Sequence, residues 1–274
     1  MSKWILRNPP MAPRDRLYPL VYPAEPDKPL TKPKKEKEWT PKGPFRFLDL
    51  PGEVRNRIYE FALLSDEKVI DLDPMNHRRI APRLQLLSTC RQIYEEAYHI
   101  FYARNVFRLF PTNVAFFQTK KVLLSRLPAK YRSEITTLEL RLGPGWSKPP
   151  KTWKATEDGR IKLGLSDCTS VRRLNIFVEV DPSHDIFKGF RVDDRFYTLF
   201  CGHLLGDLFE QMPSIEEIFF EAFPAVPKDG ALMTELVGVT EAESKRIIWG
   251  KHFTTELKPP ECDSMQVMMA ALRL

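Results

Sequence analysis

The stretch "ITTLEL", residues 135–140, places its apolar residues in the order apolar-x-x-apolar-x-apolar. The same order returns in "VRRLNI", residues 171–176, and in "IEEIFF", residues 215–220. In each hexamer the last two apolar positions alternate with polar or variable ones, which is typical of a strand that buries one face. We therefore predict three strands of the same kind in this half of the chain.

Helix and strand are predicted to alternate around these hexamers. Their second apolar positions, Leu138, Leu174 and Ile218, are separated by 36 and 44 residues, more than the roughly 20 to 29 residues of a regular leucine-rich repeat. We expect either a short, irregular solenoid of stacked α/β units or a mixed sheet with helices on one side. The helix predicted before the third strand carries, at intervals of four, Phe196, Phe200, Leu204, Leu208 and Met212.

The first 44 residues differ in composition from the rest of the chain. They hold 10 of the 24 prolines, and 10 Lys or Arg against 5 Asp or Glu. The remainder has 32 basic and 31 acidic residues, so most of the net charge of +6 belongs to this segment. We predict a disordered, Pro-rich basic arm over residues 1–44. Its run "KPKKEK" (Lys32 to Lys37) allows a nuclear-localisation signal, but the interrupting glutamates favour a solvated linker.

Beyond the arm, the composition predicts a folded protein, as one globular unit or two closely packed ones. Hydrophobic residues make up 43% and charged residues 28% of the chain, which is enough for a core. No stretch approaches the roughly 20 apolar residues that span a bilayer, so we expect no membrane partner and a cytoplasmic or nuclear location. The cysteines form no CxxC pair, which argues against a zinc site or a disulfide framework; they are Cys90, Cys168, Cys201 and Cys262.

Patterns that would indicate a reaction are absent. The sequence contains no HExxH, GxSxG, GxGxxG or P-loop motif. "DLDPMN", residues 71–76, gathers oxygen ligands but lacks the glycine and the terminal glutamate of a calcium loop. His203 lies in an apolar helical stretch and is predicted to be a structural residue. The carboxylate pairs Glu95/Glu96 and Glu216/Glu217 are adjacent in sequence and do not converge. We therefore expect no catalytic residue, no cofactor and no metal.

A second set of patterns lies before the strands. "FLDLPGEVRNRIYEFALL", residues 47–64, begins with a proline turn and predicts a helix from Pro51 to about Ser65. A polar loop containing Asp71 and Pro82 is expected next, and then a helix over residues 86–101, a strand over 105–110 and a helix over 113–127. The first helix has an apolar stripe of Val54, Ile58, Phe61 and Ala62, opposite a polar face of Arg55, Arg57 and Glu60.

Two further helices are predicted near the end of the chain. Thr240 followed by Glu243 matches a capping box and predicts a helix start. "SMQVMMAALRL", residues 264–274, predicts a last helix whose methionines face the core, since Met at this spacing is usually packing material.

The stretches 47–63 and 86–107 together resemble the N-terminal signature of a large group of fungal F-box-like proteins. The signature has a Leu-Pro-x-Glu-x-x-x-x-Ile start, a Cys-Arg-Gln-Ile-x-x-Glu-Ala helix and a Phe-Tyr-x-x-Asn-x-Phe ending. The matching positions are Leu50, Pro51, Glu53 and Ile58, then Cys90, Arg91, Gln92, Ile93, Glu96 and Ala97, then Phe101, Tyr102, Asn105 and Phe107.

The resemblance implies an architecture and a kind of role. In an F-box, the Leu-Pro segment and the following helices bind the Skp1-type adaptor of a cullin ubiquitin ligase, and downstream repeats hold a protein substrate. The implied fold class is a mixture of α+β and α/β: an F-box-like helical module over residues 45–110, then irregular leucine-rich-like helix-strand units over 111–274. The two parts can form one continuous core.

The candidate adaptor-binding residues are apolar, and two hypotheses about them stay open. In the first, they form a partly apolar surface that binds in a groove of the adaptor. In the second, all five lie in the protein's own core beneath the helix of residues 86–101. The first hypothesis makes the protein a noncatalytic interaction protein that serves as a substrate receptor. A different reading of the whole chain is a nucleic-acid or chromatin-associated factor that binds through the basic arm. The candidate residues are Leu48, Leu50, Pro51, Val54 and Ile58.

Overall fold

The computed structural model divides the chain into two units, Met1–Phe45 and Arg46–Leu274. The arm predicted over residues 1–44 lies almost wholly outside the described residues, as do the helix predicted over 264–274 and most of the one predicted over 113–127. The described residues are 43–65, 69–71, 74–110, 112, 123–143, 146–147, 153, 155, 163–184, 187–189, 193 and 195–254.

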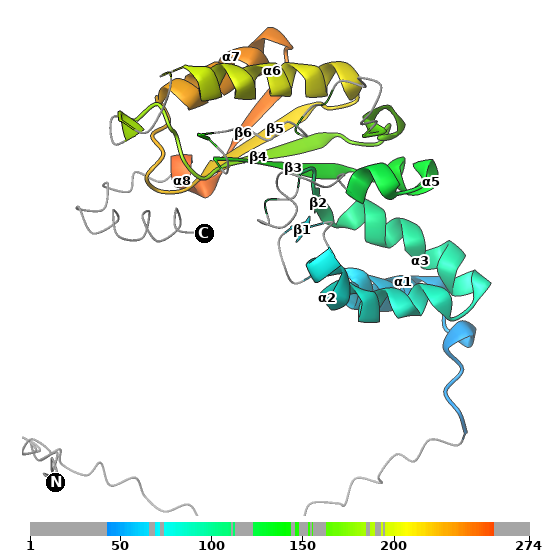
Figure 1. Cartoon of the computed structure of the whole chain (residues 1–274). Coiled ribbons are helices and arrows are strands. Elements are labelled where there is room, and N and C mark those ends of the chain that lie inside the picture. The colour runs from blue at the N-terminus through cyan, green and yellow to red at the C-terminus, as the bar shows by residue number, and fades with distance from the viewer. Residues whose placement is uncertain are drawn as a thin grey trace, which may run out of the picture. The chain divides into compact units, whose positions relative to one another are not determined.

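The second unit is built on a six-stranded sheet (Figure 1). Its strands follow one another in the order β1-β2-β3-β4-β5-β6, and every neighbouring pair is parallel. Each strand is therefore reached from the one before it by a crossover, which agrees with stacked α/β units and excludes a mixed sheet among the described strands. A strand order without reversal also has no switch point, the place where open α/β sheets usually bind cofactors.

Seven α-helices accompany the sheet in the described residues, together with short 3₁₀ turns. The strands are β1 (Ile70–Asp71), β2 (Val106–Arg108), β3 (Thr137–Leu142), β4 (Arg173–Val178), β5 (Glu217–Ala222) and β6 (Arg246–Trp249). The helices are α1 (Gly52–Leu63), α2 (Pro74–Leu84), α3 (Arg91–Arg104), α5 (Ala129–Arg132), α6 (Phe196–Gln211), α7 (Ala231–Ala242) and α8 (Lys251–Thr254). The 3₁₀ turns are η1 (Phe47–Asp49), η2 (Gln85–Ser88), η3 (Leu123–Arg126) and η4 (Leu165–Asp167).

The three predicted hexamers form three neighbouring strands in register. Leu138 pairs with Leu174, and Leu174 pairs with Ile218, so the apolar positions that the sequence aligns are also aligned in space. These side chains are completely buried. The row continues across the whole sheet as an apolar ladder, made of Ile70, Phe107, Leu138, Leu174, Ile218 and Ile247.

Helices α6 and α7 lie over one face of the strands β4 to β6 (Figure 1). Leu204, Leu208, Leu232 and Leu236 of these helices are buried in the same core as the apolar ladder, so the ladder faces the helices. The alternate residues of the strands face the opposite way and are mostly charged. We call this second side of the sheet the polar face.

The prediction of a loop around Asp71 and Pro82 is wrong for most of that segment. Asp71 ends strand β1, and Pro82 lies inside helix α2. A loop was predicted here because proline lacks the backbone N–H that a residue inside a helix donates. Here Pro82 comes two residues before the helix ends at Leu84, so little of α2 follows the interruption.

The helix predicted from residue 86 begins later. Leu86 and Leu87 belong to a 3₁₀ turn, and α3 starts at Arg91 with the exposed Cys90 as its N-cap residue. The apolar spacing continues through the turn, so periodicity alone could not locate the break. The strand predicted after this helix is confirmed as β2.

The helix predicted to start at Thr240 is also wrong. Thr240 is the buried third-last residue of α7, and its hydroxyl donates to the carbonyl of Leu236 at 2.7 Å, one turn earlier. Threonine can form this bond inside a helix as well as a cap at its start, so the motif is ambiguous. Strand β6 follows instead, after Ser244 turns the chain at φ 53°.

Candidate functional site

Helix α1 turns the side that carries Arg55, Tyr59 and Leu63 towards the protein, and not the side that carries its apolar stripe. Tyr59 and Leu63, four residues apart, are completely buried, and the side chain of Arg55, one turn before Tyr59, is 14% exposed. These residues face α3, which α1 contacts. Sequence reasoning placed Arg55 on the polar outer face, so the orientation of the helix differs from the one that its apolar stripe suggests.

The apolar stripe of α1 is exposed. Val54 is 42% exposed, Ile58 37% and Phe61 91%, and these three positions follow one another as i, i+4 and i+7. Leu48, in the turn before the helix, is 42% exposed. The hypothesis that all the candidate adaptor-binding residues lie in the core is therefore wrong. Ala62, the fourth member of the predicted stripe, is half-buried. From here on, the apolar stripe means Leu48, Val54, Ile58 and Phe61.

The remaining candidate residues lie at the start of the same surface. Pro51 is exposed and is the N-cap residue of α1, and Leu50 is half-buried. Phe61 was recognised in the sequence as part of the helix but not as a candidate for binding. Its exposure could not be deduced from spacing, because the pattern i, i+4, i+7 is the same whether a helix faces its own core or a partner.

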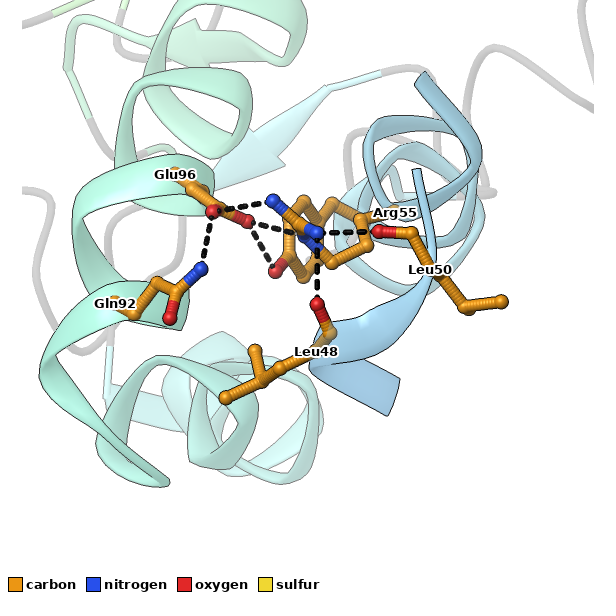
Figure 2. Close-up of polar contacts among 6 residues, drawn as sticks. Leu48, Leu50, Arg55, Gln92 and Glu96 are labelled. Atoms are coloured by element: carbon orange, nitrogen blue, oxygen red, sulfur yellow. Dashed lines mark hydrogen bonds and ion pairs between the residues drawn. The ribbon is translucent and has the colours of Figure 1, made fainter. Parts of the chain in front are cut away.

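A network of polar side chains holds α1 against α3 (Figure 2). Arg55 binds the Glu96 carboxylate with two nitrogens, at 2.8 Å through Nε and 2.7 Å through Nη2. The same carboxylate accepts hydrogen bonds from Tyr59 Oη at 2.8 Å and from Gln92 Nε2 at 3.0 Å. Glu96 therefore points towards α1, whereas the sequence suggested that it lies on a solvated helix surface with Glu95.

The network changes the protonation of its members. Hydrogen bonds from Arg55, Gln92 and Tyr59 favour the charged carboxylate and lower the pKa of Glu96 to about 2. Burial, together with the hydrogen bond to Glu96, raises the pKa of Tyr59 to about 12. The pKa of Arg55 is raised as well, chiefly by its hydrogen bond to Glu96. At neutral pH the arrangement is thus a bidentate ion pair with a neutral phenol donor.

Arg55 also fixes the turn that precedes the helix. Its Nη1 donates to the carbonyl oxygens of Leu48, at 3.1 Å, and Leu50. Figure 2 shows the guanidinium between this turn and Glu96. A planar guanidinium can bind a carboxylate with one edge and backbone carbonyls with another, which a lysine cannot do. The position of the turn that holds Leu48 and Leu50 therefore depends on Arg55, which lies between α1 and α3.

A buried asparagine joins the other ends of the two helices. Asn105, which follows α3, donates from Nδ2 to the carbonyls of Phe101 at 2.9 Å and Leu63 at 3.2 Å. Its Oδ1 accepts from the backbone N–H of Ser65 at 2.9 Å. Asn105 thus satisfies backbone groups that the C-termini of α1 and α3 leave without helical partners. Arg55 and Asn105 thus hold α1 against α3 near the start of α1 and at its end.

The other residues considered for chemistry do not converge. No group of three or more His, Cys, Asp or Glu in the described part of the chain is arranged to hold a metal ion. Asp71, from the calcium-like stretch, forms an ion pair with Arg108, and His203 is exposed on α6. Burial raises the pKa of Cys168 to about 12 and also raises the pKa of Cys201, so these thiols are poor nucleophiles.

The comparisons with known proteins give one family match. The model of a domain of unknown function, DUF7730, matches residues 65–146, which include α2, α3 and strands β1 to β3. The match starts after α1 and carries no activity, so it neither confirms nor contradicts the F-box-like resemblance. No curated protein and no solved structure matches the chain. Among the described residues, no helix is long and apolar enough to cross a membrane.

Proposed function

We propose that this chain is a noncatalytic interaction protein that docks a Skp1-type adaptor through α1 and acts as an F-box-type substrate receptor of a cullin ubiquitin ligase. The observation that carries the proposal is the apolar stripe on the outer side of α1. Its spacing of i, i+4 and i+7 is that of helices that bind in a partner's apolar groove. The resemblance of residues 47–63 and 86–107 to F-box-like proteins supports the choice of partner.

The size of the stripe suggests how much surface the adaptor has to cover. Complete burial of an exposed Val, Ile or Phe side chain contributes about 1.5–3 kcal/mol. Val54 and Ile58 are already more than half covered, so α1 alone falls short of the roughly 8 kcal/mol of a micromolar complex. The adaptor is therefore expected to contact Leu48 and Pro51 as well.

The network behind the stripe favours such binding. Because Arg55 holds the carbonyls of Leu48 and Leu50, the turn and the helix are already in a fixed relation before a partner arrives. Preorganisation lowers the conformational entropy that binding would otherwise remove. The polar side of α1, which faces α3, thus fixes the position of the docking surface, and the exposed apolar side forms that surface.

Calorimetric titration of the full chain with a Skp1-type adaptor tests the proposal. The double variant Val54→Asp plus Ile58→Asp should abolish binding, since it places two charges in an apolar groove. Asn56→Asp is the matched control, because Asn56 is exposed on the same helix but outside the stripe, and it should bind as the natural chain does. The urea unfolding curves of the natural chain, the double variant and the control should coincide. Absence of binding by the natural chain, or full binding by the double variant, rejects the proposal.

A second candidate function rests on the sequence of the arm. Residues 1–44 carry 10 basic and 5 acidic residues, which favours contact with nucleic-acid phosphates. Deletion of this segment should then abolish DNA or RNA binding, and that binding should weaken steeply with salt before the deletion. Unchanged binding after the deletion rejects this candidate, and neither result affects adaptor docking by α1.

A further inference from the structure

A hollow of about 500 Å³ lies between helices α6 and α7. The two helices lie side by side over the sheet, on the side opposite the polar face (Figure 1). Most of the residues that line the hollow are exposed, so it opens on the outer surface of this helical layer. Along α7 its lining is uncharged except for Glu235, and the uncharged residues are Ala231, Thr234, Gly238, Val239 and Ala242.

The start of α6 adds exposed apolar side chains to the same layer. Phe196 is 52% exposed and Leu199 39%, and in the sequence they stand on either side of Thr198, which lines the hollow. The outer side of a helix on a protein surface usually carries charged and polar residues. Here it carries mainly uncharged and apolar ones, which is typical of a surface that another protein covers.

Two side chains of opposite charge line the hollow, Arg195 at the N-cap of α6 and Glu235 of α7. Neither forms an ion pair with any residue in the described part of the chain. Glu235 reaches across to α6, because its Oε1 atom lies 2.8 Å from the position that a Cβ atom on Gly202 would take. Gly202 comes seven residues after Arg195, which is about 10 Å along a helix. The hollow therefore holds an unpaired cation and an unpaired carboxylate, one towards each end.

We propose that a second copy of this chain covers the hollow, in a two-fold dimer that places Arg195 of each copy against Glu235 of the other. In a two-fold contact the same surface serves both copies, so residue i meets residue j and j meets i. Such a contact requires both members of its ion pair on one surface, and this hollow supplies them. The axis passes near Leu199, midway between Arg195 and Gly202, and the two α6 helices cross it in opposite directions. The dimer contact does not depend on adaptor docking by α1.

Other kinds of partner fit this surface less well than a second copy. A strongly acidic partner would be repelled by Glu235, and a strongly basic one by Arg195. A wholly apolar helix would cover both charges without pairing either of them, which costs free energy. In the dimer both charges are paired, and Phe196 and Leu199 of the two copies leave water together. Because these apolar side chains are few, we expect a reversible dimer and not a permanent one.

Analytical ultracentrifugation of the full chain at increasing concentration tests the dimer. The natural chain should change from monomer to dimer as its concentration rises through the micromolar range. Arg195→Glu sets two carboxylates against each other in both contacts, and Glu235→Arg sets two guanidinium groups against each other. Each variant alone should therefore dimerise at least about tenfold more weakly. An equimolar mixture of the two variants should form a mixed dimer, because every contact in it again joins a carboxylate to a guanidinium.

Glu210→Arg is the matched control, since Glu210 is exposed on the last turn of α6 and does not line the hollow. This variant should dimerise as the natural chain does. The Val54→Asp plus Ile58→Asp variant should also still dimerise, which separates this contact from the apolar stripe and from adaptor docking. Leu199→Asp places two like charges at the axis and should give a monomer with unchanged circular dichroism.

Three results would overturn the proposal. The first is a natural chain that stays monomeric at every concentration. The second is a dimer that either single charge reversal leaves intact. The third is a mixture of the Arg195→Glu and Glu235→Arg variants that does not associate.

Discussion

The first helix and the apolar ladder distribute their apolar residues in opposite ways. In the ladder, Leu138, Leu174 and Ile218 face α6 and α7, and charged residues occupy the other side of the strands. In α1, Val54 and Phe61 face outwards, and the charged Arg55 faces α3. An apolar stripe therefore shows that one side of an element avoids water, but not whether its own core or a partner covers that side.

The largest difference between the two regions should appear in stability. Leu138→Ala removes completely buried methyl groups and leaves a cavity, so it should lower the free energy of unfolding by about 2–5 kcal/mol. Ile58→Ala on α1 should lower it by clearly less, about 1 kcal/mol, because Ile58 is 37% exposed and its truncation leaves no enclosed cavity. Urea unfolding followed by circular dichroism measures both. Equal losses would mean that α1 presents its stripe to the core.

For adaptor binding, substitutions in α1 should have the larger effect and substitutions in the sheet half the smaller one. Phe61→Ala removes the most exposed side chain of the stripe and should weaken adaptor binding by about 2 kcal/mol, roughly 30-fold, as for the central residue of an interface. Phe196→Ala is the control, since Phe196 is 52% exposed but lies on α6. Titration calorimetry of both variants gives the comparison. A similar loss for Phe196 would place the contact on the sheet half of the unit.

A smaller effect is expected from the hydroxyl of Tyr59. Tyr59→Phe keeps the buried ring but removes the hydrogen bond to Glu96, so the free energy of unfolding should fall by about 1–2 kcal/mol. Tyr98→Phe on α3 should have no measurable effect, because the Tyr98 hydroxyl forms no hydrogen bond with the described residues. Unfolding curves in urea distinguish the two. Identical curves would show that the network adds little to the contact between α1 and α3.

The smallest effect should be a pH dependence. The folded pKa of Glu96, about 2, lies below its ordinary value of about 4.3, so its stabilising effect is complete above pH 4.3 and is lost as pH falls towards 2. The natural chain should therefore lose more stability between pH 6 and pH 3 than Glu96→Gln does. Glu95→Gln, at an exposed neighbouring position, should follow the natural chain. Parallel loss in Glu96→Gln would contradict the network.

The sheet could be predicted from sequence in large part, because burial of one strand face leaves a period of two in the residues. The hexamers predicted the strands β3, β4 and β5, which are confirmed, but not how they pair; the structure adds that Leu138, Leu174 and Ile218 are register partners. Strand β6 was missed because Thr240 and Glu243 imitate a helix start. Helix α2 was missed because it contains Pro74 and Pro82, and proline inside a segment argues against a helix.

The candidate site could be predicted only in part. The motif located α1 and the turn of Leu48 and Leu50, but not the inward direction of Arg55. That direction depends on Glu96, 41 residues later, and no local pattern in the sequence reports a pair at this separation. Phe61 was missed as a binding residue for the same reason, since its exposure follows from the orientation that Arg55 and Tyr59 impose on the helix.

Photo-crosslinking tests most directly whether the outer side of α1 meets the adaptor. A photoreactive phenylalanine analogue at position 61 of the full chain, irradiated with a Skp1-type adaptor, should give a covalent product between the two proteins. The same analogue at position 196 should give none. Efficient crosslinking at position 196 with none at position 61 would contradict a docking surface on the first helix.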